Sequence, residues 1–406
     1  MNEIEQSIAA GDDHLLDGPA GSGKTTLMQV LAMKWSGRAG FVLTAPTHKA
    51  VEVLRRKLKQ IDVDVGISTI HSLLSLRPKI VDQRQVFERV PRAKPPDARV
   101  VVIDEVSMLG SDLMAHIRKI LRYVVVIYVG DIAQLPPVGE IESDAFRLKL
   151  RSHLATIERQ SGDNPILDAA DIIRRSQGQP ADWSWCRKAM KKPLGVYVPG
   201  ANLDDWMRKA FTSDEFNEDP DSFRYLAYTN ARVTAINNRI RRWRYGEITT
   251  PFVAGERALV REPVIQDDAI LLHTNEEATV VEIERATASV LNGEWRVPSW
   301  RITLRNDEGL EVFVDTVREP AAYTAALDKL VKDKDWKAYH VLKQSFARIQ
   351  SIYALTIHTA QGSTFKNCFI DVPELKWWSR NNLLESQKGT YVGVTRASHA
   401  LILAGV

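Results

Sequence analysis

The chain has 406 residues, and its 54 lysines and arginines against 51 aspartates and glutamates leave a formal net charge of +3. This length suits roughly two to four domains, and the even charge balance excludes a uniformly basic nucleic-acid binder, so any basic track is local. Two distant cysteines, Cys186 and Cys368, and the lack of a long apolar run argue against a disulfide framework, a zinc site, a membrane span or a signal peptide, and favour a reducing compartment.

Residues 18–26 read GPAGSGKTT and match the pattern G-x-x-x-x-G-K-[ST] without a mismatch. Residues 14–17 predict a short buried strand before this stretch, and residues 27–32 predict a helix after it. Glycines let the backbone wrap closely around a triphosphate, the lysine can reach the β- and γ-phosphates, and the threonine hydroxyl can hold Mg²⁺. The predicted nucleotide-binding residues are Gly18, Gly21, Ser22, Gly23, Lys24, Thr25 and Thr26. The alternative is a glycine-rich turn before an ordinary helix.

Two further strand–helix units follow the phosphate-binding loop. Residues 40–45 predict a strand, and residues 46–59 predict a helix with an apolar face at Val51, Leu54 and Leu58. Four basic residues of this helix are assigned to its solvent-exposed face: Arg55, Arg56, Lys57 and Lys59. Residues 68–74 repeat the change from a polar turn to an apolar helix. Alternating strands and helices predict a parallel α/β sheet.

Residues 75–98 interrupt this alternation, because they are polar and rich in proline, arginine and lysine. Residues 79–81 and 85–87 are suited to the two arms of a small hairpin that turns at residues 82–84. A mobile loop is the alternative.

Residues 99–105 contain a β-branched run at 100–103, which predicts a strand that is buried on both faces and that ends in Asp104 and Glu105. Doubly wound sheets bind ligands at this end of their strands. Asp104 can hold Mg²⁺, and Glu105 can orient and polarise the attacking water. On its own the pair could be a strand end beside a helix cap, but a phosphate-binding loop upstream makes the catalytic interpretation stronger.

The next predicted strand, at residues 124–129, leads into a proline-containing turn at 130–138. Gln134 in this turn could donate to a phosphate or hold the water without neutralising Glu105, whereas the simpler reading is a proline-braced loop. Residues 166–175 predict a helix.

A second α/β unit begins with the predicted strand at residues 224–230 and its following helix. From 255 to 316 the apolar period changes to two, which predicts antiparallel strands around 258–260, 278–283, 299–304 and 310–314 and a small inserted β-barrel. Residues 321–347 predict charged helices. The α/β unit resumes at 351–363 and ends with residues 390–398 and a last strand at 400–403.

Eight stretches in this order resemble the motifs of superfamily 1 helicases: GPAGSGKTT, TAPTHKA, STIHSLL, VVVIDEVSM, VGDIAQLPPV, AYTNARV, ALTIHTAQGSTF and YVGVTRAS. The residues of these motifs are similar to those of the 1B branch, the RecD-like helicases, and within that branch to those of Dda-type helicases. The resemblance implies an α/β fold with two RecA-like P-loop domains of parallel sheets, plus an inserted β-hairpin and an inserted SH3-like β-barrel. The implied domains are residues 1–74 and 99–178 (1A), 75–98 (the hairpin, 1B), 179–253 and 346–406 (2A), and 254–345 (the barrel, 2B).

The resemblance supports the catalytic roles of Lys24, Glu105 and Gln134 and the metal ligands Thr25 and Asp104. It adds Arg159 and Arg396 as arginine fingers, with Gln361 and Gly362 lining the same cleft. The implied nucleic-acid contacts are Pro46, Thr47, His48, Thr69, His71, Thr356 and His358, and Phe87, because Dda-type helicases carry an aromatic residue in the hairpin. The family reads adenine with a glutamine on a longer N-terminal helix, and the chain departs from this because Gln6 stands only 12 residues before Gly18.

The implied activity is ATP-dependent unwinding of duplex DNA with 5′-to-3′ movement on the single strand, with ATP and Mg²⁺ as cofactors. The implied partners are single-stranded DNA and single/double-strand junctions, together with replication or recombination proteins, and the implied state is a monomer in a bacterial or phage-infected cytoplasm. Two alternatives stay open. One is a DNA-stimulated ATPase module of a larger complex, and the other is an RNA helicase of the same superfamily.

Overall fold

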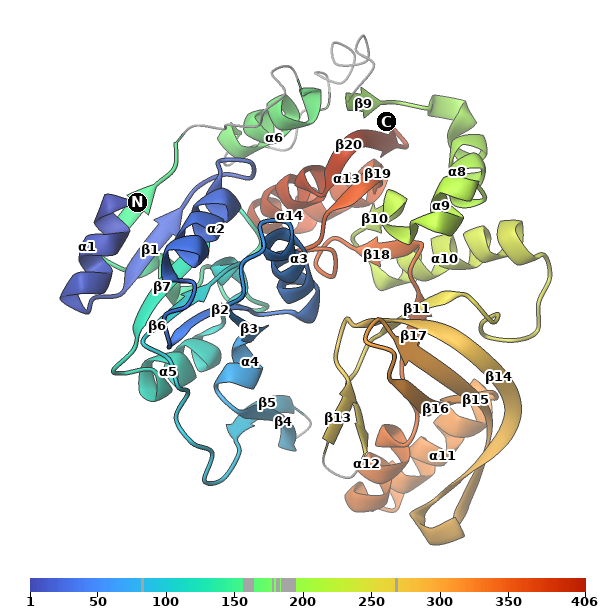
Figure 1. Cartoon of the computed structure of the whole chain (residues 1–406). Coiled ribbons are helices and arrows are strands. Elements are labelled where there is room, and N and C mark those ends of the chain that lie inside the picture. The colour runs from blue at the N-terminus through green and yellow to red at the C-terminus, as the bar shows by residue number, and fades with distance from the viewer. Residues whose placement is uncertain (82–83, 156–163, 177–178, 180–182, 184–194, 267–268) are drawn as a thin grey trace. The chain divides into compact units, whose positions relative to one another are not determined.

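The computed structural model describes residues 1–81, 84–155, 164–176, 179, 183, 195–266 and 269–406 (Figure 1). The chain forms two compact units. The first contains Met1–Leu203, Tyr225–Thr229 and Thr356–Val406, and the second contains Asp204–Arg224 and Asn230–Leu355. The predicted nucleotide-binding and nucleic-acid-binding residues all belong to the first unit.

A six-stranded sheet with the order β3-β2-β6-β7-β1-β8 lies in the first unit. Its strands are β1 (His14–Asp17), β2 (Phe41–Ala45), β3 (Gly66–Thr69), β6 (Val100–Ile103), β7 (Val125–Gly130) and β8 (Arg151–His153). Neighbouring strands run parallel throughout, which confirms the parallel α/β prediction. Because the strands are parallel, the segments after β1, β6 and β7 begin at the same edge of the sheet.

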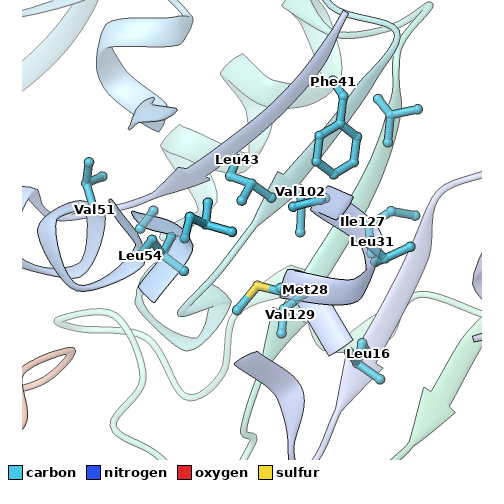
Figure 2. Close-up of a cluster of buried hydrophobic side chains, with 14 of the residues drawn as sticks. Leu16, Met28, Leu31, Phe41, Leu43, Val51, Leu54, Val102, Ile127 and Val129 are labelled. Carbon is cyan, nitrogen blue, oxygen red and sulfur yellow. The ribbon is translucent and has the colours of Figure 1, made fainter. Parts of the chain in front are cut away.

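Helices cover both faces of this sheet (Figure 1). They are α1 (Asn2–Ala10), α2 (Lys24–Trp35), α3 (His48–Lys59), α4 (Ile70–Leu73) and α5 (Ser111–Ile120), with short 3₁₀ turns at Val106–Met108 and Asp144–Arg147. Leu16 packs in a cluster with residues of α1, α2 and α3, which Figure 2 shows in close-up, whereas its neighbour Leu15 packs with residues of α4 and α5. Successive strand residues point to opposite faces, so each strand contributes to both cores.

The N-terminal helix α1 is not predicted from the sequence. Most of its residues are polar, but Ile4 is fully buried in the hydrophobic cluster that contains Leu16, and Ile8 packs against that cluster. Two residues four positions apart lie on one face of a helix, but a stretch of nine residues is too short to make this period evident.

Residues 75–98 contain two strands, β4 (Leu76–Val81) and β5 (Arg84–Arg89), which pair antiparallel from Leu76 opposite Arg89 to Val81 opposite Arg84. These strands include both predicted arms. The turn itself, residues 82 and 83, lies outside the described residues.

Most of a five-stranded sheet with the order β18-β10-β19-β20-β9 lies in the C-terminal part of the first unit. Its strands are β9 (Gly195–Tyr197), β10 (Phe223–Ala227), β18 (Ala354–Thr356), β19 (Phe365–Asp371) and β20 (Ala397–Ala404), and the helices here are α6 (Pro165–Arg175), α13 (Val372–Asn381) and α14 (Leu383–Thr395). Strand β20 pairs parallel with β19 and with β9. Helix α14 is buried along most of its length, and Gly389 allows the ring of Trp378 to approach its backbone, since a Cβ there would lie 2.1 Å from the ring.

The second unit contains a five-stranded sheet with the order β16-β15-β14-β11-β17 and a two-stranded sheet. Its strands are β11 (Arg257–Val260), β12 (Val264–Gln266), β13 (Ala269–Leu272), β14 (Glu277–Val290), β15 (Trp295–Asn306), β16 (Glu311–Val317) and β17 (Ile349–Ser351). Its helices are α8 (Leu203–Phe211), α9 (Asp214–Glu218), α10 (Asn230–Tyr245), α11 (Pro320–Lys332) and α12 (Trp336–Gln344), and short 3₁₀ turns span Pro220–Ser222 and Leu291–Gly293. A further 3₁₀ turn at Gly200–Asn202 belongs to the first unit. The large sheet pairs antiparallel, as the period of two predicts. Among the described residues, no helix combines the length and the apolar character needed to span a bilayer.

Candidate active site

The phosphate-binding loop connects β1 to α2. Gly21 and Gly23 have φ of +82° and +87°, a conformation that glycine adopts without steric cost. Lys24 Nζ donates to Gly18 O at 2.6 Å and to Pro19 O at 2.8 Å, so the lysine curls over the loop. The Ser22 hydroxyl is buried and has no hydrogen-bond partner among the described residues. An unpaired buried hydroxyl beside glycine amides at a helix N-terminus fits an anionic phosphate group.

Asp104 and Glu105 follow directly after β6, at the edge of the sheet where the loop begins. Asp104 Oδ1 accepts a hydrogen bond from Glu105 N at 2.9 Å. Burial of the Asp104 carboxyl, reinforced by the negative charge of Glu105, raises the pKa of Asp104 to about 7. Glu105 has a left-handed φ of +55°, which is uncommon for a residue with a side chain and is often found at functional sites.

Lys57 corrects the sequence-based assignment of a solvent-exposed side chain. Arg55, Arg56 and Lys59 are exposed, but Lys57 is half-buried and its Nζ donates to Thr25 Oγ1 at 3.3 Å. The positive charges of Lys24 and Lys57 both act to lower the pKa of Asp104. Helical periodicity missed this contact because Lys57 lies at the border of the apolar stripe, and a long side chain there can turn either way.

Thr25 and Asp104 supply a hydroxyl and a carboxylate, which are ligands that Mg²⁺ accepts together with phosphate oxygens and water. The ammonium group of Lys57 beside Thr25 indicates that this position favours a positive charge. Among the described residues there is no group of three or more His, Cys, Asp or Glu side chains suited to a metal. The residues therefore fit an ion that is held largely by a bound nucleotide rather than by a protein cage.

Gln134 and Gln361 are brought together although they are distant in sequence. Gln361 Nε2 donates to Gln134 Oε1 at 3.3 Å, to Ser107 Oγ at 3.1 Å and to Leu135 O at 3.3 Å, and both glutamines are buried. Gly362 has a φ of +79°, and a Cβ there would lie 3.5 Å from Ala50 Cβ. These contacts connect the segment after β18 with the segments that follow β6 and β7.

Arg396 does not contact the phosphate-binding loop through any of its observed hydrogen bonds. Its guanidinium group is buried and donates to Val392 O at 3.1 Å, to Ser363 O at 2.8 Å and to Thr395 Oγ1 at 3.2 Å. A role as an arginine finger would require these contacts to be exchanged. Arg159, the other predicted finger, lies outside the described residues.

Three of the predicted nucleic-acid contacts share one local structure. Thr47 accepts from Ala50 N, Thr69 accepts from Ser72 N, and Thr356 accepts from Thr359 N, each at 3.2 Å. In the last two turns the threonine also shares a hydrogen bond of 2.8 Å with the hydroxyl three residues on. Each threonine therefore caps a turn that begins at the end of a strand, and the N-terminal end of such a turn suits an anionic group such as phosphate.

The aromatic and histidine side chains near these turns form two groups. The ring of half-buried Phe87 lies 4.3 Å from that of His71, and Phe87 O accepts from His116 Nε2 at 3.1 Å. His358 lies 5.3 Å from the ring of Trp378 and 3.6 Å from Glu385 Oε1, and burial lowers its pKa. Pro46 and His48 flank Thr47 and are half-buried.

Two protein families match the chain. Residues 2–187 match the AAA domain, and residues 351–404 match the UvrD-like helicase C-terminal domain. The ATP-dependent DNA helicase Dda of Enterobacteria phage T4 is 25% identical over 98% of this chain and 96% of its own length. The structure of Bacteroides Pif1 bound to single-stranded DNA is similar with a TM-score of 0.52, 17% identity, and coverage of 99% of this chain and 91% of that chain. The Pif1 complex from Bacteroides with ADP-AlF3 and single-stranded DNA has a TM-score of 0.51, 18% identity, and coverage of 100% and 92%.

The parallel sheets and the phosphate-binding loop define a P-loop ATPase. The two family matches and the Dda match along nearly the whole chain support an ATP-dependent DNA helicase of superfamily 1B, the RecD-like branch. The structural likenesses support the fold, and the Dda match, which spans nearly the full length of both chains, supports the activity.

Proposed function

We propose that this chain couples ATP hydrolysis at residues 18–26 to 5′-to-3′ movement along single-stranded DNA and to separation of the duplex ahead. The observation that carries the proposal is the hydrogen bonding of Gln361. This side chain belongs to the segment that contains Thr356 and His358, and it contacts Gln134 and Ser107 beside the catalytic carboxylates. A change at the nucleotide can therefore be transmitted to the DNA-contacting turn through these buried hydrogen bonds.

In hydrolysis Lys24 contacts the β- and γ-phosphates, and Glu105 orients the attacking water and takes its proton. Gln134 donates to the phosphate or to the water, and its neutral amide leaves the charge of Glu105 intact. Thr25 and Asp104 would hold Mg²⁺, which supplies positive charge to the phosphates. Arg396 and Arg159 add positive charge to the transition state once they reach the nucleotide.

The single strand is bound mainly through its phosphates, at the capped turns of Thr47, Thr69 and Thr356. Such contacts position the strand without reading its sequence. Residues 75–98 form the inserted hairpin and residues 254–345 the inserted SH3-like barrel, with RecA-like domains at 1–74 and 99–178 and at 179–253 and 346–406. The antiparallel pairing of β4 with β5 and of β11 with β14 is compatible with these two insertions.

ATP hydrolysis measured with and without nucleic acid tests the proposal. Single-stranded DNA should strongly stimulate turnover, because the arginine fingers contact the nucleotide only in a closed form. The affinity for the strand should be insensitive to base order and should fall steeply with salt, as phosphate contacts require. An ATPase indifferent to DNA would contradict the proposal, and equal stimulation by RNA would favour an RNA helicase.

Phe87→Ala should leave DNA-stimulated ATPase near the wild-type rate while unwinding falls about tenfold or more, because stacking on a terminal base pair contributes about 1–3 kcal/mol. The ring already lies against His71, a predicted DNA contact. The assays are strand separation and ATPase on the same forked substrate.

Val86→Ala is the matched control for the Phe87 variant, since successive strand residues point to opposite faces. It should preserve both activities. If Phe87→Ala reduces ATPase and unwinding together with a lower melting temperature, Phe87 only fastens β5 to the hydrophobic cluster that includes Leu74 and Leu76, against which it packs.

A further inference from the structure

Tyr391 of helix α14 contacts the phosphate-binding loop directly. Its hydroxyl accepts a hydrogen bond from Ala20 N at 2.9 Å and donates to Asp131 Oδ2 at 2.6 Å. The side chain is almost completely buried. Burial, and then the negative charge of Asp131, raises the pKa of Tyr391, so the hydroxyl stays protonated. With its proton committed to the carboxylate, the oxygen presents a lone pair to the loop amide.

Asp131 is held by several groups at once. Its Oδ1 accepts from Ala133 N at 3.0 Å and lies 3.9 Å from the guanidinium group of Arg174, and its carboxyl group is fully buried. It belongs to the turn after β7 that contains Gln134. The carboxylate thus has a fixed position, and it orients the Tyr391 hydroxyl toward the loop.

The contacts of Lys24 and Tyr391 fall on consecutive peptide groups of the loop. Lys24 Nζ donates to the carbonyl oxygens of Gly18 and Pro19, and the Tyr391 hydroxyl accepts from Ala20 N, the other end of the Pro19–Ala20 peptide group. Lys24 has to leave these carbonyls to reach a phosphate, whereas the Tyr391 contact can persist when nucleotide binds. The hydrogen bond between Ala20 N and the Tyr391 hydroxyl therefore keeps the first half of the loop in place while the lysine moves.

We propose that Tyr391 is a positioning residue for the nucleotide site: oriented by Asp131, it holds the phosphate-binding loop in its binding conformation and ties helix α14 to it. The inference rests on the proposed function, in that the loop is taken to bind ATP. Tyr391 need not touch the substrate. Because α14 ends at Thr395, directly before Arg396, the same contact links loop conformation to the segment that contains the proposed arginine finger.

Tyr391→Phe tests this proposal, since it removes one hydroxyl and keeps the ring. The affinity for a fluorescent ADP analogue with Mg²⁺ should fall about tenfold, which is the factor that one net hydrogen bond to a charged network supplies. In DNA-stimulated hydrolysis the KM for ATP should rise by a similar factor while kcat changes little, because ground-state and transition-state binding are weakened alike.

Tyr225→Phe is the matched control. Tyr225 is also fully buried and its hydroxyl donates to a buried aspartate, Asp371 Oδ2, at 2.7 Å, but it lies in β10 and not at the loop. This variant should lose a comparable amount of thermal stability and bind ADP within twofold of the wild type. Asp131→Asn provides a second test, because a neutral amide holds the Tyr391 hydroxyl more weakly, and it should weaken ADP binding in the same sense.

Wild-type ADP affinity in both Tyr391→Phe and Asp131→Asn would overturn the proposal, as would an equal loss in Tyr225→Phe. The ADP measurement uses no DNA. A failure of DNA-stimulated hydrolysis in the wild-type protein would therefore refute the proposed function without deciding the role of Tyr391, which the binding measurement decides by itself.

Discussion

Glu105→Gln should reduce ATP turnover by about 10²–10⁴-fold, the contribution of a general base, while ADP binding stays at the wild-type level. Glutamine has the shape of glutamate and tolerates the left-handed φ of +55° at this position equally well. The variant keeps Asp104, so the predicted metal ligand is unchanged. Turnover is measured with saturating single-stranded DNA, and binding is measured separately with a fluorescent ADP analogue.

Two comparison variants make this result specific. Lys24→Ala should lose nucleotide binding as well as turnover, and Asp104→Asn should weaken the Mg²⁺ dependence of binding. If Glu105→Gln hydrolyses ATP at the wild-type rate, or if Asp104→Asn rather than Glu105→Gln preserves binding and loses turnover, the roles assigned to the two carboxylates are wrong.

Arg396→Ala should reduce DNA-stimulated turnover by about 10³-fold or more, as the loss of an arginine finger does in other phosphoryl-transfer enzymes. DNA affinity should change little, because the phosphate contacts at Thr47, Thr69 and Thr356 are intact. In the structure the guanidinium group donates to Val392 O and Ser363 O. We therefore expect these hydrogen bonds to be exchanged for contacts with the nucleotide during the cycle.

Loss of the three hydrogen bonds of Arg396 will also lower stability, so the measurement needs a control. Arg244 likewise donates to a main-chain carbonyl, Phe211 O, and to Asn217 Oδ1 at 2.7 Å, but it lies in the second unit. Arg244→Ala should lower the melting temperature and leave turnover unchanged at a temperature where both variants are folded. Wild-type turnover in Arg396→Ala would make Arg396 a structural clamp.

The sequence predicts the architecture of the first unit well for a physical reason. The central strands β6 and β7 are short, mostly apolar runs at 100–103 and 125–130, and polar residues follow each of them. Burial on both faces requires this composition, so the pattern is readable without tertiary information. Helix α1 is missed because its buried face consists of few residues, Ile4 foremost.

The sequence predicts only part of the site, because some of its contacts join segments that are distant in the chain. Contiguous motifs identify the phosphate-binding loop and the carboxylates, because backbone geometry dictates those residue types. The contacts of Lys57 with Thr25, and of Tyr391 with Ala20 and Asp131, depend on how distant segments pack. Periodicity contains no signal for them. The family resemblance identifies residues 390–398 as a motif, but it does not predict a hydrogen-bond partner for the Tyr391 hydroxyl.

Unwinding of two matched DNA duplexes, one with a 5′ single-stranded tail and one with a 3′ tail, tests the central claim most directly. Both carry the same duplex sequence and are assayed under single-turnover conditions with ATP and Mg²⁺. We expect the 5′-tailed duplex to be separated in an ATP-dependent reaction that Glu105→Gln abolishes, and the 3′-tailed duplex to stay intact. Preferential separation of the 3′-tailed duplex, or ATP hydrolysis on both tails with separation of neither, would contradict the account.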